Sequence, residues 1–125
     1  MRTVLLSVLF LFGASAHAGG TIQAKKASGI TVQKIKNAKS PTPLATFDHN
    51  GKNVEIRCMG KDKSIVCQLH DPGQDRAKVP SSALTVCYVG NDMGILTNSM
   101  GLKGRKILIS GMAAGQEGTL AKCAQ

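Results

Sequence analysis

Aromatic residues are scarce in this sequence, which has no Trp, one Tyr and three Phe. Only Phe47 and Tyr88 lie after residue 18. Proteins that bind single-stranded nucleic acids stack the bases on exposed aromatic rings. Two aromatic residues, each suited to a hydrophobic core, leave little for such a surface. The composition therefore argues against binding of nucleic acids or sugars by stacking.

Motifs for covalent or metal chemistry are also missing. The sequence has no Gly-x-Ser-x-Gly nucleophile elbow, no P-loop and no Cys-x-x-Cys pair. Its seven acidic residues are scattered at or near predicted turns. His49 and His70 lie at the ends of predicted strands, without the spacing of metal ligands. We therefore expect no catalytic residue, no metal site and no cofactor, and we expect that the protein is not an enzyme.

The long apolar run of the sequence is at its N-terminus. Arg2 precedes an apolar stretch over residues 4–12, which ends in Ala16-His17-Ala18. This order is typical of a secretory signal peptide over residues 1–18, removed after Ala18. We expect a periplasmic or secreted protein whose cysteines are oxidised. No later apolar run approaches the roughly 18 residues of a membrane span, so no transmembrane segment is expected after cleavage.

Positive charge dominates the rest of the chain. The sequence has 16 Lys and Arg against 7 Asp and Glu, and its formal net charge is +9. Such an excess favours acidic partners, although a solvated surface without a partner has the same composition. Two basic groups supply the candidate partner-binding residues: Lys25, Lys26, Lys34, Lys36, Lys39, Lys103, Arg105 and Lys106. A third group, Lys61 with Lys63, lies at a predicted hairpin tip, where lysines deter edge-to-edge association of sheets.

Residues 44–70 alternate between apolar and polar side chains around two predicted turns. Asn50-Gly51 is a strong hairpin signal, because both central residues of a type I′ turn need a positive φ. Folding about this pair sets Phe47 opposite Val54 on an apolar face. A second turn at residues 62–63 continues the same face. We therefore expect a three-stranded antiparallel meander with one side in the core.

The four cysteines are predicted to form two structural disulfides. The second turn of the meander, at residues 62–63, sets Cys58 opposite Cys67, so these two are expected to pair. Cys87 and Cys123 are then left to pair with each other. Four cysteines allow three pairings, and the sequence favours this one without fixing it.

Further strands are expected over residues 84–89, 105–112 and 119–123. Residues 71–75 predict a turn, and residues 93–104 fit either a short strand or a single helical turn. Residues 19–43 are rich in Lys and predict a basic N-terminal arm. In that arm Ile30, Val32 and Ile35 supply one strand, the rest is mobile, and residues 40–43 form a stiff linker.

We therefore expect an all-β fold over residues 44–125, with six or seven short strands. It would be a small antiparallel β-barrel or compact sandwich with two disulfides and the basic arm. The segments 103–112 and 118–122 resemble the closing strands of an OB-type barrel. This resemblance is architectural and implies a barrel, without a functional motif.

Three functions fit these expectations. The first is an exported non-enzymatic binding or adaptor protein of the bacterial envelope, such as an accessory component of a secretion or assembly system, with a protein partner. The second is a small secreted inhibitor or immunity-type protein that blocks a hydrolase through a loop at residues 71–80 or 113–118. The third is an OB-like binder of nucleic acid or acidic glycan, supported by the charge and the architectural resemblance.

Overall fold

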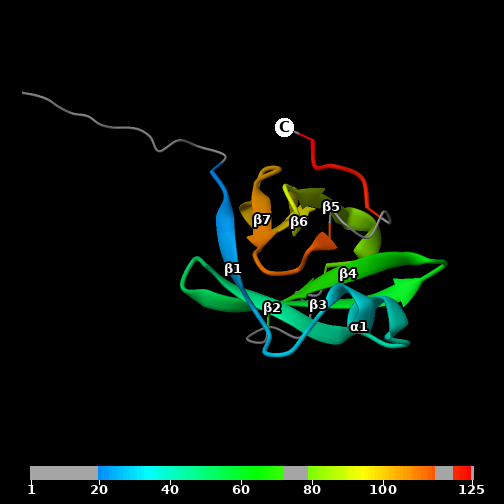
Figure 1. The fold of residues 1–125 in the computed structure, drawn as a ribbon. Coiled ribbons are helices and arrows are strands. Elements are labelled where there is room, and N and C mark those ends of the chain that lie inside the picture. The colour runs from blue at the N-terminus through cyan, green and yellow to red at the C-terminus, as the bar shows by residue number, and fades with distance from the viewer. Residues whose placement is uncertain (1–19, 72–78, 115–119, 125) are drawn as a thin grey trace, which may run out of the picture.

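The computed structural model describes residues 20–71, 79–114 and 120–124 of the chain. These residues form a nearly all-β structure in which a single sheet, in the order β4-β3-β2-β1-β7-β6-β5, rolls into a nearly closed barrel (Figure 1). The elements are β1 (Ile22–Lys26), α1 (Val32–Asn37), β2 (Thr42–His49), β3 (Lys52–Lys61), β4 (Ser64–His70), η1 (Ser81–Ala83), β5 (Thr85–Val89), β6 (Asp92–Leu96), η2 (Ser99–Gly101) and β7 (Lys106–Ile109). None of the helices described is both long and apolar enough to cross a membrane.

The three-stranded meander is confirmed in its predicted register. Phe47 lies opposite Val54 between β2 and β3, and Cys58 lies opposite Cys67 between β3 and β4. Both turns have the backbone that a type I′ hairpin requires, with φ of 52° and 78° at Asn50 and Gly51. At the second turn the left-handed residues are Asp62 and Lys63, with φ of 52° and 66°.

The prediction of a separate mobile arm is wrong for residues 20–43. β1 lies inside the sheet, antiparallel to β2 and parallel to β7. The strand expected around Ile30, Val32 and Ile35 is also wrong, because Val32 and Ile35 belong to α1. These two residues are three positions apart and are both buried, so the short helix covers the core with one face. The predicted linker at residues 40–43 runs into β2, which begins at Thr42.

The second half of the chain follows most of the expected pattern. The strand expected over residues 84–89 is β5. For residues 93–104 a strand and a helical turn were the two alternatives, and both are present: most of β6, followed by η2. The strand expected over residues 105–112 is shorter, since β7 ends at Ile109. Of the strand expected over residues 119–123, residues 120–123 are described, and they make one bridge, between Lys122 and Tyr88. Most of the turn expected at residues 71–75 lies outside the described residues.

The sheet differs from the closing hairpin of an OB-type barrel. β7 pairs with β6 on one side and in parallel with β1 on the other, while Lys122 bridges Tyr88 in β5. The edge strands β4 and β5 contact each other, which brings the barrel close to closure. The parallel pair is the one departure from an antiparallel sheet among the described strands.

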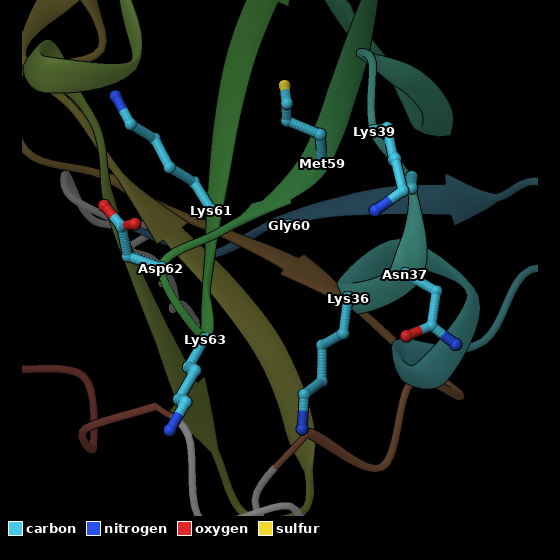
Figure 2. Close-up of a pocket in the computed structure, with 9 residues that line it drawn as sticks. Lys36, Asn37, Lys39, Met59, Gly60, Lys61, Asp62 and Lys63 are labelled. Carbon is cyan, nitrogen blue, oxygen red and sulfur yellow. The ribbon is translucent and has the colours of Figure 1, made fainter.

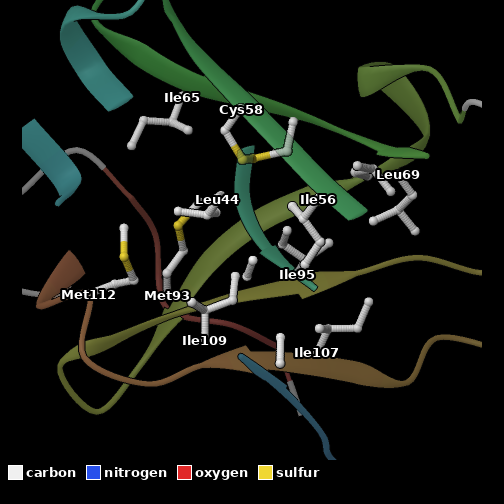
Figure 3. Packing of buried hydrophobic residues seen from close by; sticks show 14 of the residues in the cluster. Leu44, Ile56, Cys58, Ile65, Leu69, Met93, Ile95, Ile107, Ile109 and Met112 are labelled. Carbon is white, nitrogen blue, oxygen red and sulfur yellow. A yellow bond between two sulfur atoms is a disulfide. The ribbon is translucent and has the colours of Figure 1, made fainter. Parts of the chain in front are cut away.

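One hydrophobic core fills the barrel (Figure 3). It joins the inward face of the meander to β6 and β7, and its fully buried residues include Leu44, Ile56, Leu69, Met93, Ile95, Ile107 and Ile109. Both predicted disulfides are present, Cys58–Cys67 and Cys87–Cys123. The first joins adjacent strands of the meander, and the second ties β5 to the C-terminal segment. Burial of this apolar surface is the main stabilising term of the fold.

Candidate functional site

Apart from Lys25 and Lys26, which lie on β1, the structure separates the predicted basic residues into two places. Lys34 and Lys36 lie on α1, and Lys39 follows it. Lys103, Arg105 and Lys106, which we name the turn group, lie in the turn before β7 and at its first residue. Because β1 is parallel to β7 and Ile22 lies opposite Ile107, the turn group is beside the start of β1, whereas α1 follows its end. The predicted set is therefore not one surface (Figure 1).

Three of these cationic side chains are bound to backbone carbonyl groups of their own surroundings. The ammonium group of Lys26 donates to the carbonyl oxygen of Ile30 at 3.2 Å, and that of Lys34 donates to Gly29 at 3.0 Å. The guanidinium of Arg105 donates to the carbonyl oxygen of Gly20 at 3.1 Å. These contacts give the three residues a role in holding local backbone.

Lys25 lies apart from both places. It is exposed and lines a hollow of about 300 Å³ on β1 and β2, together with Thr46 and Glu55. The carboxylate of Glu55 supplies negative charge to this hollow. Lys25 therefore belongs to a surface of mixed charge.

Four lysines surround an open hollow of about 590 Å³ between the end of α1 and the β3–β4 hairpin (Figure 2). We name the four lysines that line it, Lys36, Lys39, Lys61 and Lys63, the lysine basin. Asp62 is the single acidic residue in the lining. The remaining lining residues are uncharged: Asn37, Ala38, Met59 and Gly60.

The walls of the basin are fixed by a close approach between α1 and β3. The backbone N–H of Gly60 donates to the carbonyl oxygen of Ala38 at 3.1 Å. A Cβ atom at position 60 would overlap the carbonyl oxygen of Lys36, so only glycine allows this contact. On the inner side of the helix, Ile35 is fully buried. The lysines therefore stand on two elements that are held together by packing and by a backbone hydrogen bond.

The side chains of the basin extend to two sides of the hairpin. In Figure 2, Lys36 and Lys63 extend in the same direction, one from the helix and one from the hairpin. Met59 and Lys61 extend the opposite way. Lys39, Lys61 and Lys63 are exposed, and Lys36 is half-buried. A bound anion can thus meet ammonium groups from both elements.

Lys61 and Lys63 are the basin residues that the sequence did not suggest for binding. Their signal in the sequence was a lysine on each side of Asp62, which we interpreted as protection of a sheet edge. Their position beside Lys36 and Lys39 depends on the packing of α1 against β3, which no local pattern reveals. The hairpin turn itself was predicted correctly.

The four lysines give this hollow a charge that is suited to an anionic ligand. A concave surface lined by charges of one sign concentrates its field and attracts ions of the opposite sign. Among the described residues, no group of three His, Cys, Asp or Glu side chains is placed to hold a metal ion. The two histidines in the described part of the chain lie elsewhere: a ring nitrogen of His49 contacts the carbonyl oxygen of Met100, and His70 ends β4.

Two ion pairs between described residues lie on the meander, outside the basin. Lys52 and Asp71 are 3.3 Å apart, and Arg57 pairs with Glu55. The four lysines of the basin share their hollow with one carboxylate, so the hollow is suited to electrostatic docking of an anionic ligand.

No protein-family model, no curated protein and no solved structure matches this chain.

Proposed function

We propose that this protein is an exported, non-enzymatic binding or adaptor protein of the bacterial envelope that holds an acidic segment of a protein partner in the lysine basin. The observation that carries the proposal is the placement of four lysines and one aspartate around one open hollow. The predicted signal peptide and the two disulfides support action outside the cytosol. A rigid site lowers the entropic cost of binding, and the Gly60 contact supplies that rigidity.

An acidic protein segment fits this surface better than a nucleic acid does. Phe47 is buried in the core, and Tyr88 lies on β5, away from the basin. Neither aromatic ring lines the hollow, so bases have no platform on which to stack there. Carboxylate side chains need only hydrogen-bond donors and positive charge, which the lysines provide.

Two matched variants test the basin. The basin variant combines three substitutions at exposed lysines: Lys39→Gln, Lys61→Gln and Lys63→Asn. The turn variant combines three substitutions in the other basic group: Lys103→Asn, Arg105→Gln and Lys106→Gln. Each variant removes three positive charges, and each places one Asn at a left-handed residue, since Lys63 and Lys103 both have positive φ.

The probe is a fluorescein-labelled poly-Glu peptide, titrated at low ionic strength and followed by fluorescence anisotropy. Exposed ion pairs contribute about 0.5 kcal/mol each, so removing three costs about 1.4 kcal/mol and predicts roughly tenfold weaker binding by the basin variant. The turn variant should bind within about twofold of the wild type. Equal losses in the two variants would show that net charge, and not the basin, binds the peptide.

The adaptor role is tested in the native envelope by crosslinking of the mature protein. The wild type and the turn variant should capture the same partner, and the basin variant should lose it. A partner that the basin variant still captures would contradict this site. Capture of a hydrolase whose activity is blocked would instead favour an inhibitor.

A further inference from the structure

A second hollow lies on the outer face of the sheet, next to the lysine basin. Its volume is about 320 Å³. We name it the outer groove, and its lining consists of Pro41, Arg57, Met59, Lys61, Val66, Gln68 and Ser81. Met59 and Lys61 line both hollows, so the basin and the groove are adjacent along β3.

The groove has an apolar floor on the side of the sheet that faces away from the core. Val54, Ile56 and Cys58 of β3 are buried, and the alternation of the strand places Met59 on the opposite face. Met59 pairs across the strands with Val66 of β4, and both are half-buried. Packing of the core does not explain an apolar cross-strand pair on the outward face of the sheet.

The rim of the groove is cationic at its boundary with the basin. Lys61 stands where the two hollows meet, and Figure 2 shows its side chain extending to the same side of the hairpin as Met59. Arg57 adds a second cation, which is paired with Glu55. A ligand that crosses from the basin to the groove meets ammonium groups first and an apolar floor next.

We propose that the acidic partner segment carries a bulky aliphatic side chain beside its acidic residues, and that this side chain enters the outer groove against Met59 and Val66. The inference rests on the proposed function, because the same segment occupies both hollows. Its acidic residues match the charge of the basin, and its apolar residue matches the floor of the groove. Methionine suits such a floor because its flexible thioether adapts to the shape of the ligand.

A peptide segment fits this arrangement better than a membrane surface does. A bilayer receives apolar side chains that protrude, and the tip of this hairpin is formed by Asp62 and Lys63, which are polar. Met59 and Val66 instead line a hollow, which a side chain can enter. The volume of about 320 Å³ is at the lower end of ligand sites and holds one large side chain.

Two acidic peptides of equal charge test the inference. One is a poly-Glu peptide with a central Leu, and the other has Ser in place of that Leu. Partial burial of one leucine side chain predicts about fivefold tighter binding of the Leu peptide by the wild type. The groove variant Val66→Thr changes a residue that lines the groove and not the basin. It should remove most of this preference while it still binds the Ser peptide as the wild type does.

A matched control makes the same exchange elsewhere, at Val89→Thr, a half-buried residue outside both hollows. This control should keep the fivefold preference, and circular dichroism shows whether each variant is folded. Equal affinity of the wild type for the two peptides would overturn the inference and leave the proposed function standing. Failure of both peptides to bind, or tighter binding of a single-stranded oligonucleotide, would overturn both.

Discussion

The two halves of the barrel have similar features in different arrangements. The meander half consists of α1, β2, β3 and β4, and the other half consists of β5, β6 and β7. Each half contributes a hairpin, a disulfide and a group of basic residues. In the meander half the lysines surround a hollow beside an apolar groove, whereas the turn group lies along one turn and the start of β7. In the proposed function, placement around a concave surface, and not the number of charges, makes the lysine basin the binding site.

The two disulfides should contribute unequally to stability. Cys58–Cys67 spans a sequence separation of 9, and Cys87–Cys123 spans 36. In the loop-entropy model the longer loop contributes about 3.8 kcal/mol and the shorter about 2.6 kcal/mol. Urea unfolding of Cys87→Ala/Cys123→Ala and of Cys58→Ala/Cys67→Ala measures both. If removal of Cys58–Cys67 lowered the free energy of unfolding more than removal of Cys87–Cys123, packing in the meander half would outweigh chain entropy.

Two glycines offer a second contrast between the halves. A Cβ at Gly60 would overlap the backbone of Lys36, while a Cβ at Gly94 would lie 3.0 Å from the Cys123 Sγ atom. Backbone yields less easily than a side chain, so Gly60→Ala should cost about 3 kcal/mol and Gly94→Ala about 1 kcal/mol. Gly60→Ala should also weaken poly-Glu binding, because it displaces α1 from β3. Thermal unfolding and the peptide titration test this, and equal destabilisation by the two variants would contradict the close contact.

The smallest effect is expected at two lysines with left-handed backbone. Lys63 and Lys103 have φ of 66° and 52°, a region that Asn adopts more readily than Lys. Lys63→Asn and Lys103→Asn should each raise stability by about 0.5 kcal/mol. Only Lys63→Asn should weaken binding of the acidic peptide, by about twofold. Loss of peptide binding in Lys103→Asn would contradict the basin as the binding site. A gain of stability at only one of the two positions would contradict the expectation that Asn relieves both left-handed residues.

The sequence predicted the meander well because its signals are local. Turn residues at Asn50-Gly51 and at 62–63, with alternating side chains beside them, define the register. The second turn then sets Cys58 opposite Cys67. β1 and α1 were missed for physical reasons. The helix is short, with buried residues at Val32 and Ile35, too few to show a helical period.

The position of β1 and the full lysine basin could not be predicted, because both depend on contacts between segments far apart in the sequence. β1 pairs with β7, which is more distant in the sequence than any other strand. A parallel pair is not joined by a tight turn, so no turn residues in the sequence indicate it. The lysine basin was half predicted, because Lys36 and Lys39 were candidates while Lys61 and Lys63 were assigned to protection of the edge. Their meeting depends on Gly60, whose lack of a side chain lets the helix approach β3.

The most direct test of this account is the titration of the basin and turn variants, side by side, with the same poly-Glu peptide. Both variants have the same net charge, so any difference between them reports position alone. We predict a roughly tenfold loss of affinity for the basin variant and a change within about twofold for the turn variant. Equal affinities in the two variants would contradict the assignment of the lysine basin as the binding site.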